Sequence, residues 1–519
     1  MDSPPELRPT TPVAHNLVDA KSDARPMAGD PPEDAMAQQS PSHLAGVDAV
    51  GHAELVRKGE ATPRELVDAA IARIEKQNTE LNAVIHATFE KARAQASAPS
   101  LPHGPLRGVP FLMKDLGGQT AGDLYHAGMR FLREAAWREA EDSYFAAKLR
   151  AAGAVFLGRT NTPELGLLPT TEPAAYGATK NPWDLSRSAG GSSGGAAAAV
   201  ASGMVPAAHA SDGGGSIRIP AAHCGLVGLK TTRGRSSFGP SLGERWGGFS
   251  VELAVSRTVR DTAAVLDVVQ GPMPGDPYAA APPARPYASE VDAPPGRLRI
   301  GLMTRGPRAI AVHADCTAAV QRAARLLEGL GHTIEESFPL ALDEPGAVNA
   351  YVSVVATSVA RALDAWGARV GRSVQQDSVE PLTWALAEMA RSWSSTRYLE
   401  AVESVHAFGR RVAAWWSLGF DLLLTPTTAE PPPLLGEMTS PPDVPLKGFL
   451  RAAPFGAFTS SFNMSGQPAV SLPLHWTQDG LPVGVQLVAA TGREDLLLRV
   501  ASQLEQAAPW AQRRPPVSA

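Results

Sequence analysis

The sequence predicts one large domain of the α/β class, preceded by an N-terminal extension. Helical patterns and short apolar runs alternate from residue 43 onward, which is typical of a layered α/β sheet. Neither a repeat of fixed period nor a clear domain boundary interrupts this alternation. The 519 residues are 44% hydrophobic and 19% charged, which suits a chain that buries a sizeable core. We therefore expect a domain over residues 43–519 and a disordered, Pro/Ala-rich extension over residues 1–42.

The first clear element is a helix that begins at residue 62. Thr62 and Glu65 form a Thr-x-x-Glu capping box, and Pro63 fits the first turn between them. Apolar residues then recur at helical spacing, at Leu66, Ala70, Ile71 and Ile74. This pattern predicts a scaffold helix.

The next elements are predicted strands and helices in alternation. The apolar run Val109 to Met113 predicts a buried strand that ends in Lys114. Helix, glycine turn and strand follow up to Leu157, and an alanine-rich helix and a short strand separate two glycine clusters. Further on, a helix closes at Gly329 or Gly331, residues 345–420 are mostly helical, and "FDLLLTPTT" and "PAVSLPLHW" read as strands.

Charge and cysteine content exclude several classes. The formal net charge is −5 and the pI about 6.2, which argues against nucleic acid as a partner. No apolar run is long enough for a membrane span, and no signal peptide is visible. The two cysteines, Cys224 and Cys316, form no metal-binding motif, so we expect no metal, a buried inert thiol at Cys224 and a cytoplasmic location.

The most informative feature is a pair of serine-bearing glycine clusters, "GGSSGG" at 190–195 and "SDGGGSIRIP" at 211–220. Tight loops are the simplest explanation of each cluster alone. G-x-S-x-G is matched at Ser192 and Ser193, but the preceding "NPWDLSRSA" is not a buried strand, and His406 and His475 lie in no recognisable setting. The Walker pattern is absent from both clusters.

Acyl transfer without histidine makes better use of these residues. A serine needs a base, and a lysine serves if it is neutral near pH 7. Lys114, at the end of a buried apolar run, is placed for such desolvation. The run from Gly213 to Ser216 can turn backbone N–H groups toward a developing oxyanion.

Five blocks together resemble the amidase signature family. They are "GVPFLMKD", "GRTNTPELG", "NPWDLSRSAGGSSGG", "SDGGGSIRIPAAHCGLVGLKTTRGR" and "FNMSGQPAVSLP", they occur in the family's order, and 24 residues separate Ser192 from Ser216. The resemblance spans about residues 43–510 and implies a three-layer α/β/α domain with a central mixed sheet and peripheral helices.

The resemblance also implies residue roles. Ser216 would be the nucleophile and Lys114 would be the base. Ser192, which would follow a cis peptide bond, would relay the proton between them. The oxyanion hole would consist of the backbone amides of Gly213, Gly214, Gly215 and Ser216. Ser193, Asp212 and Arg218 match supporting positions.

One residue departs from the family pattern. Many members carry Thr-Asp-Thr-Gly-Gly-Ser where this chain has Ser211-Asp212-Gly213-Gly214-Gly215-Ser216. The extra glycine, Gly213, lacks a side chain beside the oxyanion hole, so we expect a more open or mobile loop there.

The resemblance implies hydrolysis of carboxylic amides without a cofactor. The runs "TTEPAAYGATKNPWDLSRS" and "GREDLLLRVASQLEQAAPWAQRRPP" resemble bacterial amidases that act on nylon-type cyclic oligoamides. We therefore expect a small-molecule amide, aryl, cyclic or oligomeric, as substrate and a monomer or homodimer. The candidate pocket residues are Tyr125, His126, Trp246, Phe462 and Asn463.

Three alternatives remain open at this point. The same residues would serve an ester or carbamate hydrolase, or the glutamine-hydrolysing subunit of a tRNA-dependent amidotransferase. A non-catalytic binding protein on the same fold is the third alternative, and the presence of Lys114, Ser192 and Ser216 argues against it.

Overall fold

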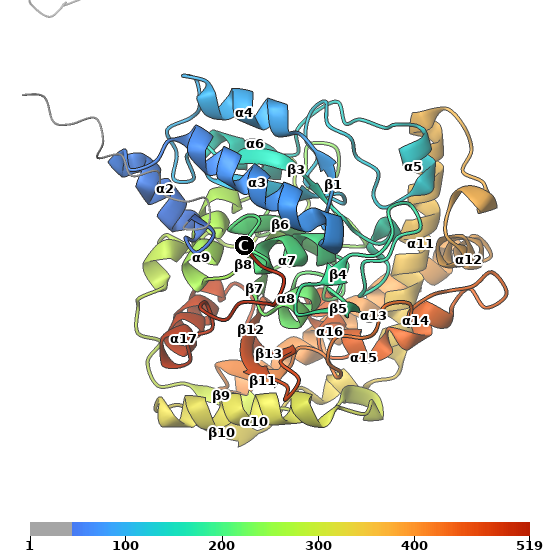
Figure 1. Ribbon diagram of the computed structural model, residues 1–519. Coiled ribbons are helices and arrows are strands. Elements are labelled where there is room, and N and C mark those ends of the chain that lie inside the picture. The colour runs from blue at the N-terminus through green and yellow to red at the C-terminus, as the bar shows by residue number, and fades with distance from the viewer. Residues whose placement is uncertain (1–43) are drawn as a thin grey trace, which may run out of the picture. The chain divides into compact units, whose positions relative to one another are not determined.

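A computed structural model describes residues 44–519, and the predicted extension over residues 1–42 lies outside them. The described chain is built on an eleven-stranded sheet with the order β1-β3-β2-β6-β8-β7-β12-β13-β11-β9-β10 (Figure 1). Strands β2, β3 and β6 run parallel to one another, as do β9, β10 and β11, while the remaining pairs are antiparallel. The predicted mixed sheet is therefore confirmed.

The strands are short and mostly buried. Their bounds are β1 (Val84–Ala87), β2 (Pro110–Lys114), β3 (Val155–Thr160), β6 (Ala207–Asp212), β7 (Val227–Lys230), β8 (Val251–Ser256), β9 (Arg299–Leu302), β10 (Thr333–Glu336), β11 (Leu422–Pro426), β12 (Ala469–Trp476) and β13 (Pro482–Ala489), with β4 (Lys180–Asn181) and β5 (Asp184–Ser188) in a separate pair.

Helices surround the sheet in the predicted α/β/α arrangement. Those along the first half of the chain are α2 (Ala49–Lys58), α3 (Pro63–Leu81), α4 (Phe89–Ser97), α5 (Arg130–Glu134), α6 (Tyr144–Ala151), α7 (Gly194–Ala201), α8 (Arg218–Cys224) and α9 (Val259–Val269). The later ones are α10 (Ala314–Gly329), α11 (Gly346–Val370), α12 (Pro381–Arg391), α13 (Ser395–Ala414), α14 (Lys447–Arg451), α15 (Ala453–Gly456), α16 (Ser460–Ser465) and α17 (Glu494–Ala507).

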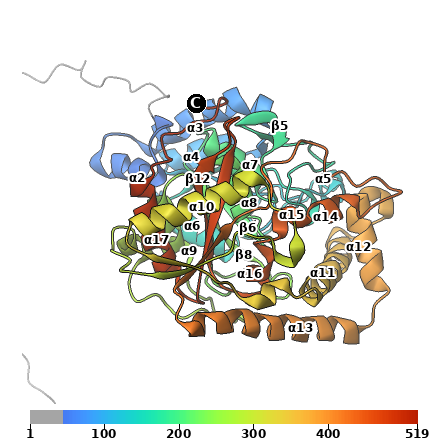
Figure 2. The same ribbon diagram turned by 90° about the horizontal axis from the view of Figure 1, so that it is seen from below.

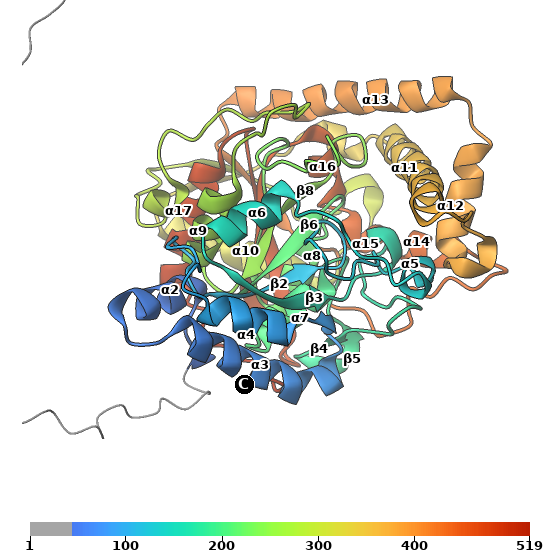
Figure 3. The same cartoon turned by 90° about the horizontal axis from the view of Figure 1, so that it is seen from above.

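The helical segment predicted over residues 345–420 is present as α11, α12 and α13. Figures 2 and 3 both show α13 at the side of the molecule opposite α3. Helix α11 packs against both α12 and α13. By length and hydropathy alone, α11 is the one helix of the described residues that could cross a membrane, and half of its apolar stretch is buried inside the fold.

The local predictions agree with the observed elements to within a few residues. The capping box is confirmed, because the Thr62 backbone N–H donates to Glu65 Oε2 (2.7 Å) while the Glu65 N–H donates to Thr62 Oγ1 (3.2 Å). The run predicted as a buried strand is β2, whose five residues are all buried. The helix predicted to close at Gly329 or Gly331 is α10, which ends at Gly329.

The strand order determines where the functional residues meet. Strands β2 and β6 are parallel neighbours, so their carboxyl ends lie at the same edge of the sheet. Lys114 is the last residue of β2 and Asp212 the last of β6. The second glycine cluster continues from β6 into α8, which begins at Arg218, whereas the first lies between β5 and α7, which begins at Gly194.

Candidate active site

Lys114 lies at the centre of the site and contacts two serines. Its side chain is completely buried, and Nζ lies 2.7 Å from Ser192 Oγ and 3.1 Å from Ser211 Oγ. Ser192 precedes α7, whereas Ser211 lies on β6 next to β2. Parallel pairing of β2 and β6 therefore brings the lysine to one serine, and the first glycine cluster brings the other.

Burial and a neighbouring cation lower the pKa of Lys114 to about 7. Burial disfavours the ammonium form, and Arg245 adds electrostatic repulsion, while Asp212 and Glu252 oppose both effects. A large fraction of the Lys114 amine is thus neutral at neutral pH. The desolvation expected from the sequence is present, and it is the largest cause of the shift.

A buried histidine supports the backbone of this lysine. The Lys114 backbone N–H donates to His209 Nδ1 (3.3 Å), so the proton of the ring is on Nε2, which lies 3.8 Å from Glu252 Oε1. Burial and the charges of Lys114 and Arg159 keep the pKa of His209 well below its ordinary value. Burial raises the pKa of Glu252 to about 7.

The peptide bond between Gly191 and Ser192 is cis, as the resemblance implied. Gly191 lies against the backbone of Thr170, where a Cβ on residue 191 would overlap that backbone. Ser193, the next residue, donates from Oγ to the Ser211 carbonyl at 3.3 Å. The first glycine cluster is thus packed directly against the end of β6.

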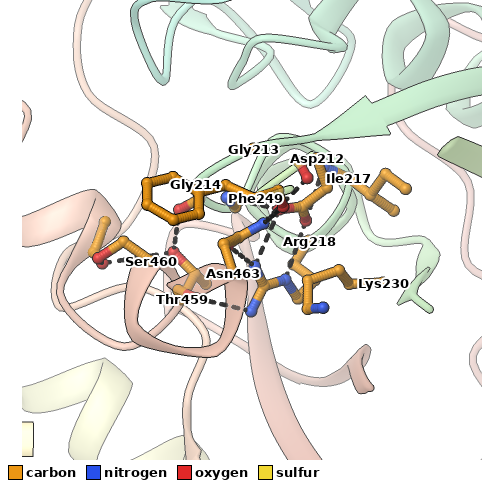
Figure 4. A network of polar contacts seen from close by, with 12 residues as sticks. Asp212, Gly213, Gly214, Ile217, Arg218, Lys230, Phe249, Thr459, Ser460 and Asn463 are labelled. Carbon is orange, nitrogen blue, oxygen red and sulfur yellow. Dashed lines mark hydrogen bonds and ion pairs between the residues drawn. The ribbon is translucent and has the colours of Figure 1, made fainter. Parts of the chain in front are cut away.

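A buried ion pair between Asp212 and Arg218 lies beneath the second glycine cluster (Figure 4). Both side chains are completely buried, and Arg218 Nε and Nη2 each lie 2.9 Å from an Asp212 oxygen. Arg218 also donates to Gln486 Oε1, Asn463 Oδ1 and the Thr459 carbonyl. Burial alone would raise the pKa of Asp212, but Arg218, Lys230 and the Asn463 amide hold it below its ordinary value.

Asp212 also determines which glycine amides remain available. Its Oδ1 accepts a hydrogen bond from the Gly215 N–H (2.7 Å), and its Oδ2 accepts one from the Ile217 N–H (3.2 Å). The predicted oxyanion donor Gly215 is therefore occupied by a carboxylate. Within residues 44–519, no hydrogen-bond acceptor contacts the N–H groups of Gly214 or Ser216, and both residues are half-buried.

Ser216 lies between this loop and α8. None of the hydrogen bonds among the described residues joins Ser216 Oγ to Ser192 Oγ. Ser216 is half-buried, whereas Ser192 and Lys114 are buried.

The expectation of an open loop at Gly213 is wrong. A Cβ on residue 213 would lie 2.7 Å from Trp246 Cε3 and 2.9 Å from Ser250 Oγ. The space that a side chain on residue 213 would need is occupied by the ring of Trp246, whose backbone has a positive φ of 55°. The extra glycine therefore permits close packing rather than creating an opening.

We expect Gly213→Ala to destabilise the protein by roughly 1–3 kcal/mol, because the new methyl group overlaps Trp246. Urea denaturation measures this change. In the double variant with Trp246→Ala the overlap with the ring disappears, so the double variant should lose less stability than the sum of the two single variants. Strict additivity would contradict the packing described for Gly213.

Four of the five candidate pocket residues are buried and engaged within the protein. Tyr125 OH accepts a hydrogen bond from the Gly117 N–H, and the His126 ring contacts Tyr176. Phe462 is part of an apolar cluster, and Asn463 belongs to the Asp212–Arg218 network. These four residues are at most 3% exposed and pack inside the protein, and the pocket role expected of them stays a prediction.

Trp246 is the remaining candidate, and it is half-buried beside the glycine loop. Sequence reasoning missed Ser211, the His209–Glu252 pair, Tyr351 and Thr459. Ser211 stands inside a quoted motif and could have been found from its place beside Asp212. Tyr351 and Thr459 lie far along the chain from the glycine clusters and carry no local signal.

The cysteine prediction is confirmed. Cys224 and Cys316 are both free and buried. Cys224 Sγ donates to the Ala189 carbonyl, and burial raises the pKa of its thiol. Across residues 44–519 no cluster of three or more His, Cys, Asp or Glu side chains could hold a metal ion.

Comparison with known proteins gives a consistent set of matches. The family model described as Amidase matches residues 65–498. The 6-aminohexanoate-cyclic-dimer hydrolase of Paenarthrobacter ureafaciens is 44% identical over 476 residues, covering 90% of this chain and 96% of that protein.

Solved structures give the same picture. The structure of 6-aminohexanoate cyclic dimer hydrolase complexed with substrate superimposes with a TM-score of 0.89 at 43% identity, over 92% of this chain and 100% of that one. The crystal structure of a bacterial aryl acylamidase of the amidase signature family has a TM-score of 0.79 at 28% identity, over 90% of this chain and 97% of that one.

Proposed function

This chain belongs to the amidase family and is an amide hydrolase that acts on small molecules. On this premise we propose that the acyl-enzyme forms on Ser216. Ser192 relays the proton and Lys114 is the base. One observation carries the assignment: the fully buried Lys114 Nζ lies 2.7 Å from the Ser192 hydroxyl.

In the first half-reaction, Ser216 Oγ attacks the amide carbon. Its proton passes to Ser192 Oγ as the Ser192 proton passes to Lys114 Nζ, which accepts it because the amine is neutral. The oxyanion accepts hydrogen bonds from the free N–H groups of Gly214 and Ser216. The C–N bond then breaks, the leaving amine takes the proton back through Ser192, and an ester on Ser216 remains.

In the second half-reaction, water attacks the ester carbon. Its proton passes through the same relay to Lys114, and a second oxyanion forms in the same place. Collapse breaks the bond between the acyl carbon and Ser216 Oγ, and Ser216 regains its proton. The products are an amine and a carboxylic acid.

We propose a cyclic or oligomeric aliphatic amide as substrate, with aryl amides second. The support is the name of the relative at 44% identity, a cyclic dimer hydrolase, and that of the aryl acylamidase at 28%. A monomer or homodimer in the cytoplasm remains our prediction for the assembly and its location.

The test is a panel of substrates given to the purified protein alone. It contains a cyclic lactam dimer, an anilide, an aryl carbamate, a p-nitrophenyl ester and glutamine, each run beside Ser216→Ala. Amine release from the lactam dimer, with a mass increase on Ser216 that the variant lacks, is the expected result. Turnover of glutamine alone, or equal acylation of the variant, would overturn the proposal.

The pKa of Lys114 predicts the pH dependence of kcat/KM. Only the neutral amine accepts the proton, and its fraction rises with pH, so kcat/KM should increase through a midpoint near 7. Replacing Arg245 by Gln removes a cation that lowers this pKa, so the midpoint should move to higher pH. A flat profile between about pH 5.5 and 8.5 would exclude Lys114 as the base.

A further inference from the structure

The carbonyl groups of three glycines in the second cluster each accept a hydrogen bond, two of them from residues outside the cluster. Tyr351 OH donates to the Gly213 carbonyl at 3.2 Å. Thr459 Oγ1 donates to the Gly214 carbonyl at 2.6 Å (Figure 4), and the Ile219 N–H donates to the Gly215 carbonyl at 2.7 Å. Tyr351 is on α11 and Thr459 directly precedes α16, so remote segments reach this loop.

Because the peptide group is planar, a contact that fixes a carbonyl also fixes the orientation of the next N–H group. In a trans peptide the C=O of one residue and the N–H of the next point in opposite directions. The Gly213–Gly214 peptide is not among the cis bonds of the described chain. A hydroxyl that holds the Gly213 carbonyl therefore determines where the Gly214 N–H points.

The neighbouring peptide serves another purpose. Thr459 holds the Gly214 carbonyl, but the N–H on the other side of that peptide belongs to Gly215 and ends at Asp212 Oδ1. Both the C=O and the N–H of this peptide are hydrogen-bonded within the protein, so it has no free donor for a substrate. Since the Gly214 N–H has no acceptor among residues 44–519, the peptide that Tyr351 holds has a free donor, unlike the peptide that Thr459 holds.

Tyr351 itself is held firmly. Its ring stacks on that of Phe249, with the centroids 5.4 Å apart and the planes 6° from parallel. Helix α11, which carries it, packs between two apolar clusters, one shared with α13 and one with α12. Burial and the charge of Asp212 raise the pKa of Tyr351, so its hydroxyl remains a donor throughout the working pH range.

We infer that Tyr351 is a positioning residue for catalysis: its hydroxyl fixes the Gly213–Gly214 peptide so that the Gly214 N–H faces the oxyanion. This inference rests on the proposed acyl-enzyme on Ser216. Tyr351 acts through the backbone, because its hydroxyl is used on the Gly213 carbonyl. The residue thereby links the helical segment α11 to α13 with the reaction at the glycine loop.

The test compares Tyr351→Phe with Tyr398→Phe. The first variant keeps the ring on Phe249 and removes only the hydroxyl. Tyr398 is the matched control, since it is also half-buried, packs on the same apolar cluster and contacts no glycine-loop carbonyl. Because removing an oxyanion donor outright lowers kcat by about 10²–10³-fold, we expect its misorientation in Tyr351→Phe to lower kcat by about 10-fold, with KM within about twofold.

A second readout isolates the oxyanion contact. An aryl boronic acid forms a tetrahedral adduct in which Ser216 Oγ donates an electron pair to boron and releases its proton to the Ser192–Lys114 relay. Its affinity should fall in Tyr351→Phe by the same factor as kcat/KM, whereas the affinity for the matching aryl carboxylate product stays unchanged. Tyr398→Phe should match wild type in every measurement.

The possible results separate the two proposals. If wild type forms no boronate adduct on Ser216, the proposed function fails. If wild type does but Tyr351→Phe retains kcat and boronate affinity, only the role of Tyr351 fails. A rise in KM at unchanged kcat would also overturn the positioning role, because it would indicate substrate binding.

Discussion

Replacing Lys114 by Met should lower kcat by about 10⁴-fold or more, the loss seen when one member of a catalytic unit is removed. The relay from Ser216 would then end at Ser192 without a base. Methionine has a similar length and is apolar, so it suits a side chain that is completely buried. The fold should therefore survive, with a thermal midpoint close to that of wild type.

The measurement is steady-state kinetics on the best panel substrate, together with thermal unfolding of both proteins. Lys91→Met is the control, since Lys91 forms a partly exposed ion pair with Asp123 and lies outside the relay. A Lys114→Met enzyme within tenfold of wild type would show that another group takes the Ser216 proton.

Arg218→Met should destabilise the protein by about 3–5 kcal/mol, because it leaves the carboxylate of Asp212 buried without its cation. The loss is largely the cost of an uncompensated charge. The amide of Asn463 and the side chain of Gln486 lose a partner at the same time. Since Asp212 orders the Gly215 and Ile217 amides, kcat should fall as well.

Urea denaturation gives the change in unfolding free energy. The matched control is Arg411→Met, which breaks an exposed pair with Glu344 and should cost less than about 1 kcal/mol. Adding Asp212→Asn to Arg218→Met removes the unpaired charge and should recover part of the loss. Equal stability of Arg218→Met and Arg411→Met would refute a structural role for the buried pair.

The pH dependence of stability follows from the same pair. The folded-state pKa of Asp212 lies below its unfolded value of 3.8. The carboxylate therefore contributes its full stabilisation above that value, and the contribution is lost as the pH falls toward the folded pKa. Arg218→Met should consequently show a weaker loss of stability on acidification than wild type.

Local sequence determined much of this protein. The capping box at Thr62 and Glu65 and the buried strand ending at Lys114 depend on contacts between near neighbours and on apolar patterning, which are visible in one dimension. The two glycine clusters are visible as sequence motifs, and their resemblance to the family pattern predicted the roles of Ser192 and Ser216. The α/β class followed from the alternation of elements, and the family from motifs that occur in a particular order.

Only the tertiary structure decided which groups are free and which are occupied. Asp212 accepts the Gly215 N–H, Trp246 fills the space at Gly213, and the Asn463 side chain accepts a hydrogen bond from Arg218. Each of these contacts, apart from the first, joins residues more than 30 positions apart. The fold determines which acceptor each backbone N–H contacts. A motif therefore shows that an amide is present but not whether another group already accepts its hydrogen bond. Tyr351 shows the same point, since it lies 138 residues from the carbonyl it contacts and only folding brings the two together.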